Sequence, residues 1–333
     1  MNKMLPRPRF WADAALQIRN PRPFFSEMLV YLVLTFLAYL GQSIIIAIPV
    51  SGWLLQSESE SMMEALSAGE SIQSLILRYM EQMPDWMVPV SLAAGGTMGV
   101  VAVVYCLKFQ KRNLVSMGLG GKRRGLEFLA GLILGAVLLC AAVGLGVAAG
   151  GYRFVSASPD FGRLGLLALT FLACLIYGAS LELLTRGYFA PSLGSRAPVG
   201  FALTVSTLAA AFMQAGGSLF SLTAANHVLL GLVLGILVLK RGNLWCACAM
   251  HSAWVFAESF LFDVAPAEAH GSLRLFEVDA DQYRPLISGG EYGPANSICT
   301  TVVLLAAVAV VLALKAKDPL PPEPEPAAAE PRL

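Results

Sequence analysis

Charged residues are scarce in this sequence. Asp, Glu, Lys and Arg make up 14% of its 333 residues, whereas 56% are hydrophobic. Soluble globular domains carry about 25% charged residues, so the composition excludes an ordinary soluble fold. The formal net charge is only +1, which gives no general attraction to nucleic acid. We therefore expect a membrane protein whose partners include membrane lipid and do not include nucleic acid.

Motifs for metals and cofactors are also missing. The sequence contains three His and no His-Glu-x-x-His pattern, so it offers no dense set of metal ligands. It has neither a Walker-type Gly loop nor a dinucleotide fingerprint, which argues against ATP-driven transport and nicotinamide chemistry. We expect no metal and no cofactor.

Long apolar runs account for the composition. Crossing a bilayer takes about 20 mostly apolar residues, and eight segments meet this requirement. The first is longer than a signal-peptide core and no small-residue cleavage site closes it, so we expect it to remain as a span. The sequence predicts an all-α polytopic membrane protein with about eight transmembrane helices, at residues 25–49, 86–107, 126–149, 164–187, 198–215, 223–239, 243–262 and 297–314.

The basic residues predict the orientation of these spans. Positive charges concentrate in cytoplasmic loops. If both termini are cytoplasmic, 18 of the 23 Lys and Arg residues lie on the inner side, and the excess alternates loop by loop. We expect a multi-pass protein of the plasma membrane with both termini in the cytoplasm.

Four regions follow from this topology. Residues 1–24 form a basic cytoplasmic N-terminus, and residues 25–109 hold two spans joined by an acidic outer loop. Apolar residues recur at helical spacing in that loop, at 55–85, which predicts an amphipathic helix. Residues 110–315 form a six-span core with a polar loop at 263–295. The Pro-rich tail, 316–333, is expected to be disordered.

Few ionisable residues lie inside the predicted spans. Such residues are functional candidates because a charge at mid-bilayer costs at least ~2.5–3.5 kcal/mol. Glu182 and Arg186 are spaced i, i+4, so they share a helix face as a potential ion pair. His251 and Glu258 share a face of a later span, two turns apart. The Glu–Arg pair has a structural and a functional interpretation, and for His227 we expect a polar packing role.

Two pairs of Gly residues indicate close helix packing. Gly131 and Gly135 lie in one predicted span, and Gly231 and Gly235 lie in another. Small residues at this spacing let the backbones of two membrane helices approach each other. We expect both pairs to be packing notches.

Several of these residues belong to a recognisable set of motifs. Residues 180–188, Ser-Leu-Glu-Leu-Leu-Thr-Arg-Gly-Tyr, resemble the Glu-Glu-x-x-x-Arg-Gly motif of the CPBP family, the CAAX-protease and bacteriocin-processing (Abi) membrane proteins. Stretches beginning at Asn226, Lys240 and His251 follow in the family's order. The resemblance covers roughly residues 110–315 and implies a CAAX-prenyl-protease-like bundle with a glutamate-dependent peptidase site.

The resemblance also implies roles for particular residues. In the family, the first Glu of the pair and a His on the next motif helix activate water, while a later His and an Asn four residues on stabilise the oxyanion. Glu182 matches the second Glu, Arg186 matches the Arg, and His251 matches the later His. These three are the main candidate catalytic residues, and the implied substrates are membrane-anchored peptides or proteins.

The sequence departs from the motifs at three positions. Leu181 stands where the first Glu is expected, Gln214 falls where the first His is expected, and Val255 replaces the Asn. Leu and Val have no hydrogen-bonding side-chain group, and Gln is no base near neutral pH. We therefore expect a CPBP-like membrane protein whose peptidase activity is weak or lost.

Three alternatives remain open. The protein could be an active intramembrane protease that uses Glu182 or Glu258 with His251. It could be a non-enzymatic scaffold or immunity protein that binds a peptide or lipid in the former active site. A secondary transporter is the third alternative, although the spans show no inverted repeat.

Overall fold

The computed structural model is a mostly helical bundle. It describes residues 5–18, 21–57, 63–64, 67, 69, 71, 83–157, 161–214, 220–262, 276–281 and 283–317. The predicted outer helix at 55–85 falls largely outside the described residues, and so does the tail from residue 318. The main helices are α1 (Arg9–Gln17), α2 (Phe24–Ser57), α5 (Met87–Ala94), α6 (Gly96–Lys108), α7 (Arg124–Ala148), α8 (Leu164–Glu182), α9 (Ala190–Gly194), α10 (Val199–Gln214), α11 (Leu222–Arg241), α12 (Trp245–Phe256) and α14 (Ile298–Ala313).

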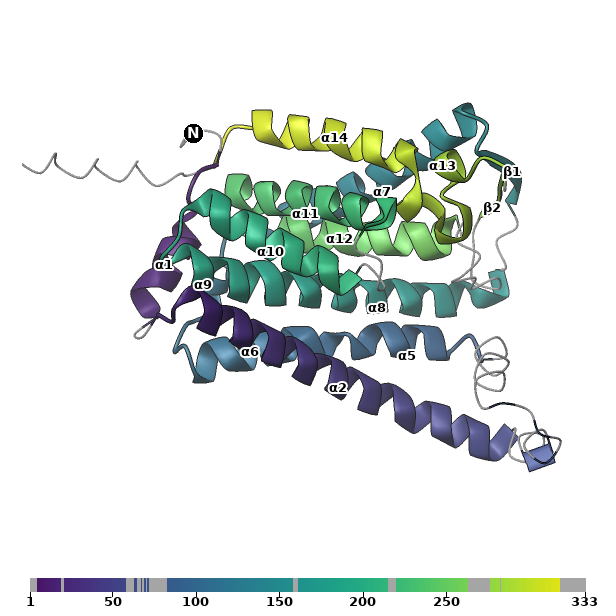
Figure 1. The fold of residues 1–333 in the computed structure, drawn as a ribbon, viewed down its shortest axis with the longest axis horizontal. Coiled ribbons are helices and arrows are strands. Elements are labelled where there is room, and N and C mark those ends of the chain that lie inside the picture. Colours follow the sequence, from purple (N-terminus) through teal and green to yellow (C-terminus); the bar gives the residue numbers. More distant parts are fainter. Residues whose placement is uncertain are drawn as a thin grey trace, which may run out of the picture.

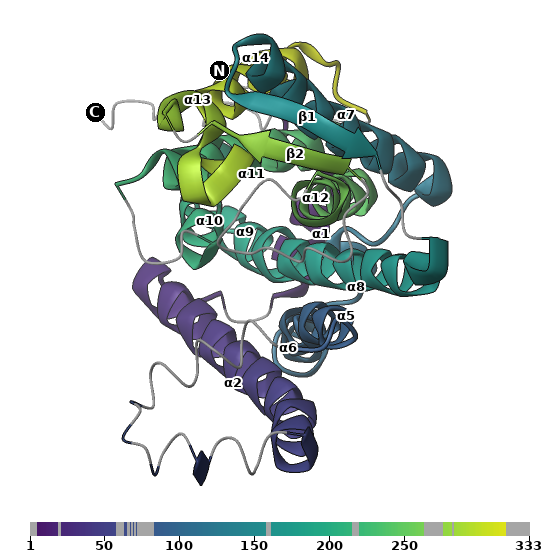
Figure 2. The same cartoon turned by 90° about the vertical axis from the view of Figure 1, so that its right-hand side faces the viewer.

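Helix α12 lies at the centre of this bundle. Figure 2 shows it end-on, with α7, α8 and α11 around it. Helices α5 and α6 pack against α8 on the other side, and α2 diverges from the rest along its length (Figure 1). Nine of the twelve residues of α12, from Cys246 to Trp254, are buried. The helix contains no Asp, Glu, Lys or Arg, which is consistent with this central position.

The predicted spans correspond to helices, but the count of eight is not confirmed. Five helical stretches in the described part of the chain are long and apolar enough to cross a membrane: Phe24–Gln56, Met87–Lys108, Arg124–Ala148, Leu164–Gly194 and Leu222–Arg241. The predicted spans near 198–215 and 297–314 are the shorter apolar helices α10 and α14. The span predicted at 243–262 is α12 followed by a π-helical segment, η4 (Ala257–Leu261).

One end of the bundle carries a small sheet, which corrects the all-α prediction. Strands β1 (Tyr152–Ala157) and β2 (Phe276–Ala280) pair antiparallel, with Tyr152 opposite Ala280. Strand β2 is followed by α13 (Pro285–Ser288) and the 3₁₀ segment η6 (Gly290–Asn296). The predicted polar loop at 263–295 is therefore partly regular. Sequence patterns miss a strand whose partner lies more than 100 residues away, because nothing local identifies the pairing.

The opposite end of the bundle holds both ends of the described chain (Figure 1). There Glu127 accepts hydrogen bonds from Arg241 Nε at 2.6 Å and from Lys317 Nζ at 2.6 Å. The Lys317 backbone N–H also donates to the Lys240 carbonyl oxygen at 2.8 Å. These contacts hold the C-terminal end of the described chain against the start of α7 and the end of α11.

The Gly pairs form packing notches, as predicted. Gly131 and Gly135 of α7 lie directly against backbone carbonyl groups of α12, those of Cys246 and Met250. A Cβ atom at either position would overlap that backbone, so only glycine permits the close approach. Gly231 and Gly235 of α11 take up side chains of α10 in the same way.

Candidate functional site

The candidate site is built where helix α8 changes its geometry. After Glu182 the chain continues as a π-helical segment, η3 (Leu183–Phe189), which is followed by α9. Pro191 lies in the first turn of α9 and has no N–H, so it cannot donate the i+4 hydrogen bond to the Gly187 carbonyl. Short π-helical stretches are rare and often mark functional sites. Arg186 lies within this segment.

Glu182, Arg186 and His251 form one hydrogen-bonded cluster. Arg186 Nη1 donates to Glu182 Oε1 at 2.7 Å, and His251 Nδ1 lies 2.8 Å from the same oxygen. Arg186 Nη2 also donates to the Gly231 carbonyl oxygen at 3.0 Å, which ties η3 to α11. The structure thus brings three of the five predicted site residues together, from helices α8, η3 and α12.

The cluster is excluded from solvent and lipid. The exposed fractions are 0% for Glu182, 2% for Arg186 and 1% for His251. The carboxylate and the guanidinium neutralise each other, which lets both lie inside a membrane bundle. With Glu182 ionised, the carboxylate can only accept, and His251 Nδ1 is then the donor in this contact.

The cluster retains polar atoms that the protein leaves unpaired. Among the described residues, Glu182 Oε2, His251 Nε2, Arg186 Nε and Thr207 Oγ1 are buried and have no hydrogen-bond partner. Buried polar groups are normally paired with protein or water. These atoms supply both acceptors and donors, so they can bind water or a polar group of a ligand.

Two glycines in neighbouring helices allow the close packing of α12 that brings His251 to Glu182. The residues on either side of His251 contact glycines: Met250 lies against Gly135 of α7, and the backbone of Ser252 lies against Gly178 of α8. Gly178 is one turn before Glu182, so both residues face α12. The small residue lets α12 approach α8 closely enough for the imidazole to reach the carboxylate.

The other two predicted site residues lie outside the cluster. Gln214, at the end of α10, donates from Nε2 to the Ala210 carbonyl oxygen of its own helix at 3.3 Å. Glu258 lies in η4, where its Oε2 accepts from Trp254 Nε1 at 3.0 Å. In the described residues no hydrogen bond joins either side chain to Glu182 or His251.

The two apolar replacements are packed as ordinary core residues. Leu181 is 1% exposed and belongs to the main hydrophobic core. Val255 is half-buried and packs with the small apolar cluster around Phe260. Neither position therefore contributes a polar group to the site.

Sequence reasoning missed three neighbours of the cluster. His227, assigned only a packing role, lies on α11 one turn before Gly231, whose carbonyl oxygen accepts a hydrogen bond from Arg186 Nη2. Tyr31 of α2 stacks on Phe189, the last residue of the segment that carries Arg186. Thr207 of α10 lies against Gly231 beside the Arg186 guanidinium. No local sequence pattern identifies these neighbours, because Gly231 meets Arg186 only through the fold.

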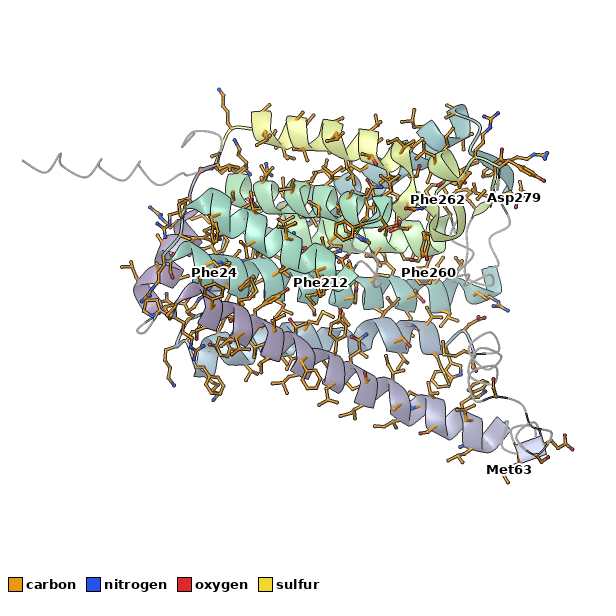
Figure 3. All side chains as sticks on the ribbon, in the orientation of Figure 1. Phe24, Met63, Phe212, Phe260, Phe262 and Asp279 are labelled. Atoms are coloured by element: carbon orange, nitrogen blue, oxygen red, sulfur yellow. The ribbon has the colours of Figure 1, made fainter. Side chains whose placement is uncertain are left out.

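An apolar groove lies between α2 and α10. Its volume is about 610 Å³. One lining residue, Tyr31, stacks its ring on Phe189 at a centroid distance of 4.1 Å, and its hydroxyl donates to Met213 Sδ at 2.8 Å. Phe24 and Phe212, labelled in Figure 3, lie on the two helices that form its walls. Its lining is Phe24, Met28, Tyr31, Leu32, Thr35, Tyr39, Val205, Leu208, Ala209, Phe212 and Met213.

Fold and site together define a polytopic helical membrane protein with a buried Glu–Arg–His cluster. In the described part of the chain no group of three or more His, Cys, Asp or Glu side chains could hold a metal ion. Residues 163–257, which contain the whole cluster, match the family model of type II CAAX prenyl endopeptidase Rce1-like proteins. The chain therefore carries an Rce1-like domain, and the resemblance to the CPBP family is confirmed. Comparisons with curated proteins and with solved structures gave no match.

Proposed function

We propose that this protein is a CAAX-protease-like membrane protein that binds membrane-anchored peptides and whose peptidase activity is weak or lost. One observation carries the proposal: the retained carboxylate, Glu182, is fully buried, and one of its oxygens is held by both Arg186 and His251. Family membership supports the peptide-binding part, because the matched segment is of the CAAX prenyl endopeptidase type.

The loss of hydrolysis follows from the chemistry of the site. Peptide-bond hydrolysis needs a base that takes a proton from water and donors that bind the developing oxyanion. At the positions where the family supplies these groups, Leu181 and Val255 are apolar and Gln214 bonds to its own helix. The Glu–Arg–His cluster can hold a polar group of a ligand without supplying either function in full.

The groove between α2 and α10 supports a lipid-anchored partner. Its walls are apolar side chains of two membrane helices, so hydrocarbon is the chemistry that fits it. One of its lining residues, Tyr31, stacks on Phe189, the last residue of the segment η3 that carries Arg186. A peptide with a hydrocarbon anchor could place the anchor in the groove and its polar end toward Arg186 and His251.

Hydrolysis can be tested with reconstituted protein. Proteoliposomes would be incubated with a prenylated CAAX-type peptide, and with the same peptide lacking the lipid, and the products measured by mass spectrometry. We expect binding of the lipidated peptide and no cleavage above the level of a His251→Ala variant. Cleavage by the unaltered protein that the variant lacks would overturn the proposal of lost activity.

An active protease is a second candidate because Glu182 Oε2 and His251 Nε2 both lack a protein partner. A water bound between them could be activated by the carboxylate. Glu182→Gln would then abolish cleavage, whereas Arg186→Lys, which keeps the positive charge, would reduce it less. If the protein is instead a scaffold or immunity protein, a specific partner co-purifies and neither variant alters any cleavage.

We also propose that the protein lies in the plasma membrane with both termini in the cytoplasm. The described ends of the chain lie together at one end of the bundle, beside the basic residues Lys240, Arg241 and Lys317. Positive residues favour the cytoplasmic face. Reporter fusions at each terminus test this, and a signal from the outer side at either terminus would contradict it.

A further inference from the structure

A second buried polar network lies beside the segment that carries Arg186. Its centre is Arg112, which follows α6 and is 2% exposed. The guanidinium donates from Nη2 to the Ser116 carbonyl at 2.6 Å and to the Gly187 carbonyl at 2.9 Å. Its Nη1 donates to Gln110 Oε1 at 3.1 Å and lies 3.4 Å from the Tyr188 carbonyl oxygen.

Two of these acceptors belong to the π-helical segment η3. Gly187 and Tyr188 directly follow Arg186, and Pro191 cannot give Gly187 the usual i+4 hydrogen bond. A buried carbonyl without a donor is unfavourable. Arg112 provides that donor from outside the helix. Its guanidinium therefore satisfies a carbonyl group that the backbone of this segment leaves unpaired.

The backbone around Arg112 is shaped for this contact. The preceding residue, Lys111, has φ of 57°, in the left-handed region that non-glycine residues rarely adopt. Gly187 lies against the Met117 carbonyl oxygen and Leu244, so a side chain there would be tightly packed against both. Burial lowers the pKa of Arg112 from its ordinary value, which shows the cost of placing a cation here.

The network also reaches α2. Gln110 Nε2 donates to Ser192 Oγ at 2.9 Å and lies 3.4 Å from Glu27 Oε1, and Tyr188 Oη donates to the same Glu27 oxygen at 2.8 Å. The chain around Arg112 thus connects α2, the helix that forms one wall of the groove, to the turn after Arg186.

We propose that Arg112 is a positioning residue of the Glu182–Arg186–His251 cluster: by holding the carbonyl groups of Gly187 and Tyr188, it fixes the π-helical turn that directs Arg186 at Glu182. The proposal rests on the proposed function only in treating this cluster as the site. It makes no claim about hydrolysis, so the two can fail separately.

The state of His251 reports on the position of Arg186. His251 and Arg186 share Glu182 Oε1, so a displaced guanidinium changes the hydrogen bond to His251 Nδ1. The chain has three His, so solid-state NMR of ring-¹⁵N-histidine protein in proteoliposomes resolves few signals. His251→Asn identifies the signal of His251, which we expect in one tautomer with the proton on Nδ1.

Arg112→Gln and Arg112→Lys are the test variants. Gln removes the charge and the forked donor, and we expect a shifted or split His251 Nδ1 signal. Lys keeps the charge but cannot serve two carbonyl groups in the same geometry, so we expect a smaller shift in the same direction. If Arg112→Gln does not fold, the Lys variant decides the question alone.

Lys240→Met is the matched control. Lys240 is also a buried cation, 3% exposed, whose Nζ donates to the Leu312 carbonyl at 3.0 Å, away from η3. It should lower the melting temperature without moving the His251 signal. A folded Arg112 variant with an unchanged His251 signal would overturn the proposal, and so would a shift of equal size in Lys240→Met.

Discussion

The Glu182–Arg186 pair makes a quantitative prediction about stability. Removing one partner of a buried ion pair leaves an uncompensated charge and costs about 3–5 kcal/mol. Both side chains are at most 2% exposed, so solvent cannot screen the remaining charge. We expect Glu182→Gln and Arg186→Met each to lower the free energy of unfolding by about this amount.

The double variant should cost much less than the sum of the two single changes. The two introduced side chains, glutamine and methionine, are both neutral, so no charge is left buried, and replacing a buried pair by uncharged residues is often nearly neutral. We expect the protein that carries both Glu182→Gln and Arg186→Met to be at least about as stable as either single variant. The coupling energy of the double-mutant cycle is then on the order of 3 kcal/mol.

Reversible unfolding in mixed micelles, followed by circular dichroism during a detergent titration, measures each corner of the cycle. The pair Asp85–Arg163 provides a control cycle, because both of its side chains are more than a third exposed, at 36% and 41%. Solvent screening limits such a pair to about 1 kcal/mol. Additive effects at Glu182 and Arg186, or an equal coupling in the control, would refute the reasoning.

Three further predictions concern packing and the groove. Gly135→Leu would overlap the Met250 carbonyl and should cost at least about 1–3 kcal/mol, measured as a lower melting temperature. Tyr152→Phe removes the hydrogen bond to the Ser288 carbonyl at 2.6 Å and should cost about 1 kcal/mol in the same assay; an unchanged value would show that this bond contributes nothing. Ala209→Trp would fill the groove and should weaken binding of a lipidated peptide several-fold, whereas a peptide without the lipid should bind unchanged.

Local spacing predicted much of the site. The i, i+4 separation of Glu182 and Arg186 was sufficient to predict their ion pair, because the contact lies within one helical turn. The Gly131 and Gly135 pair predicted a close helix contact for the same reason. Both features depend on residues a few positions apart, and the sequence contains that information directly.

Other parts of the site depend on tertiary contacts that no local pattern encodes. The stacking of Tyr31 on Phe189 joins segments more than 150 residues apart. In the sequence, Arg112 does not differ from the other basic residues of the predicted loops. Only the fold shows that its side chain is buried and donates to the Gly187 carbonyl oxygen. The π-helical turn also has no periodic signature, since its apolar pattern does not differ visibly from that of an α-helix.

The cluster is difficult to explain as a purely structural remnant. Its three residues bond to one another, yet uncharged packing of the same volume is often as stable as a buried ion pair, and each charge opposes insertion into the bilayer. Stability alone therefore gives little reason to keep Glu182 and Arg186. Leu181 and Val255, which differ from the family motif, are by contrast packed as ordinary apolar residues. A site that binds a polar group without hydrolysing it would need the charged cluster and its unpaired atoms, and would not need a base or an oxyanion donor at the altered positions.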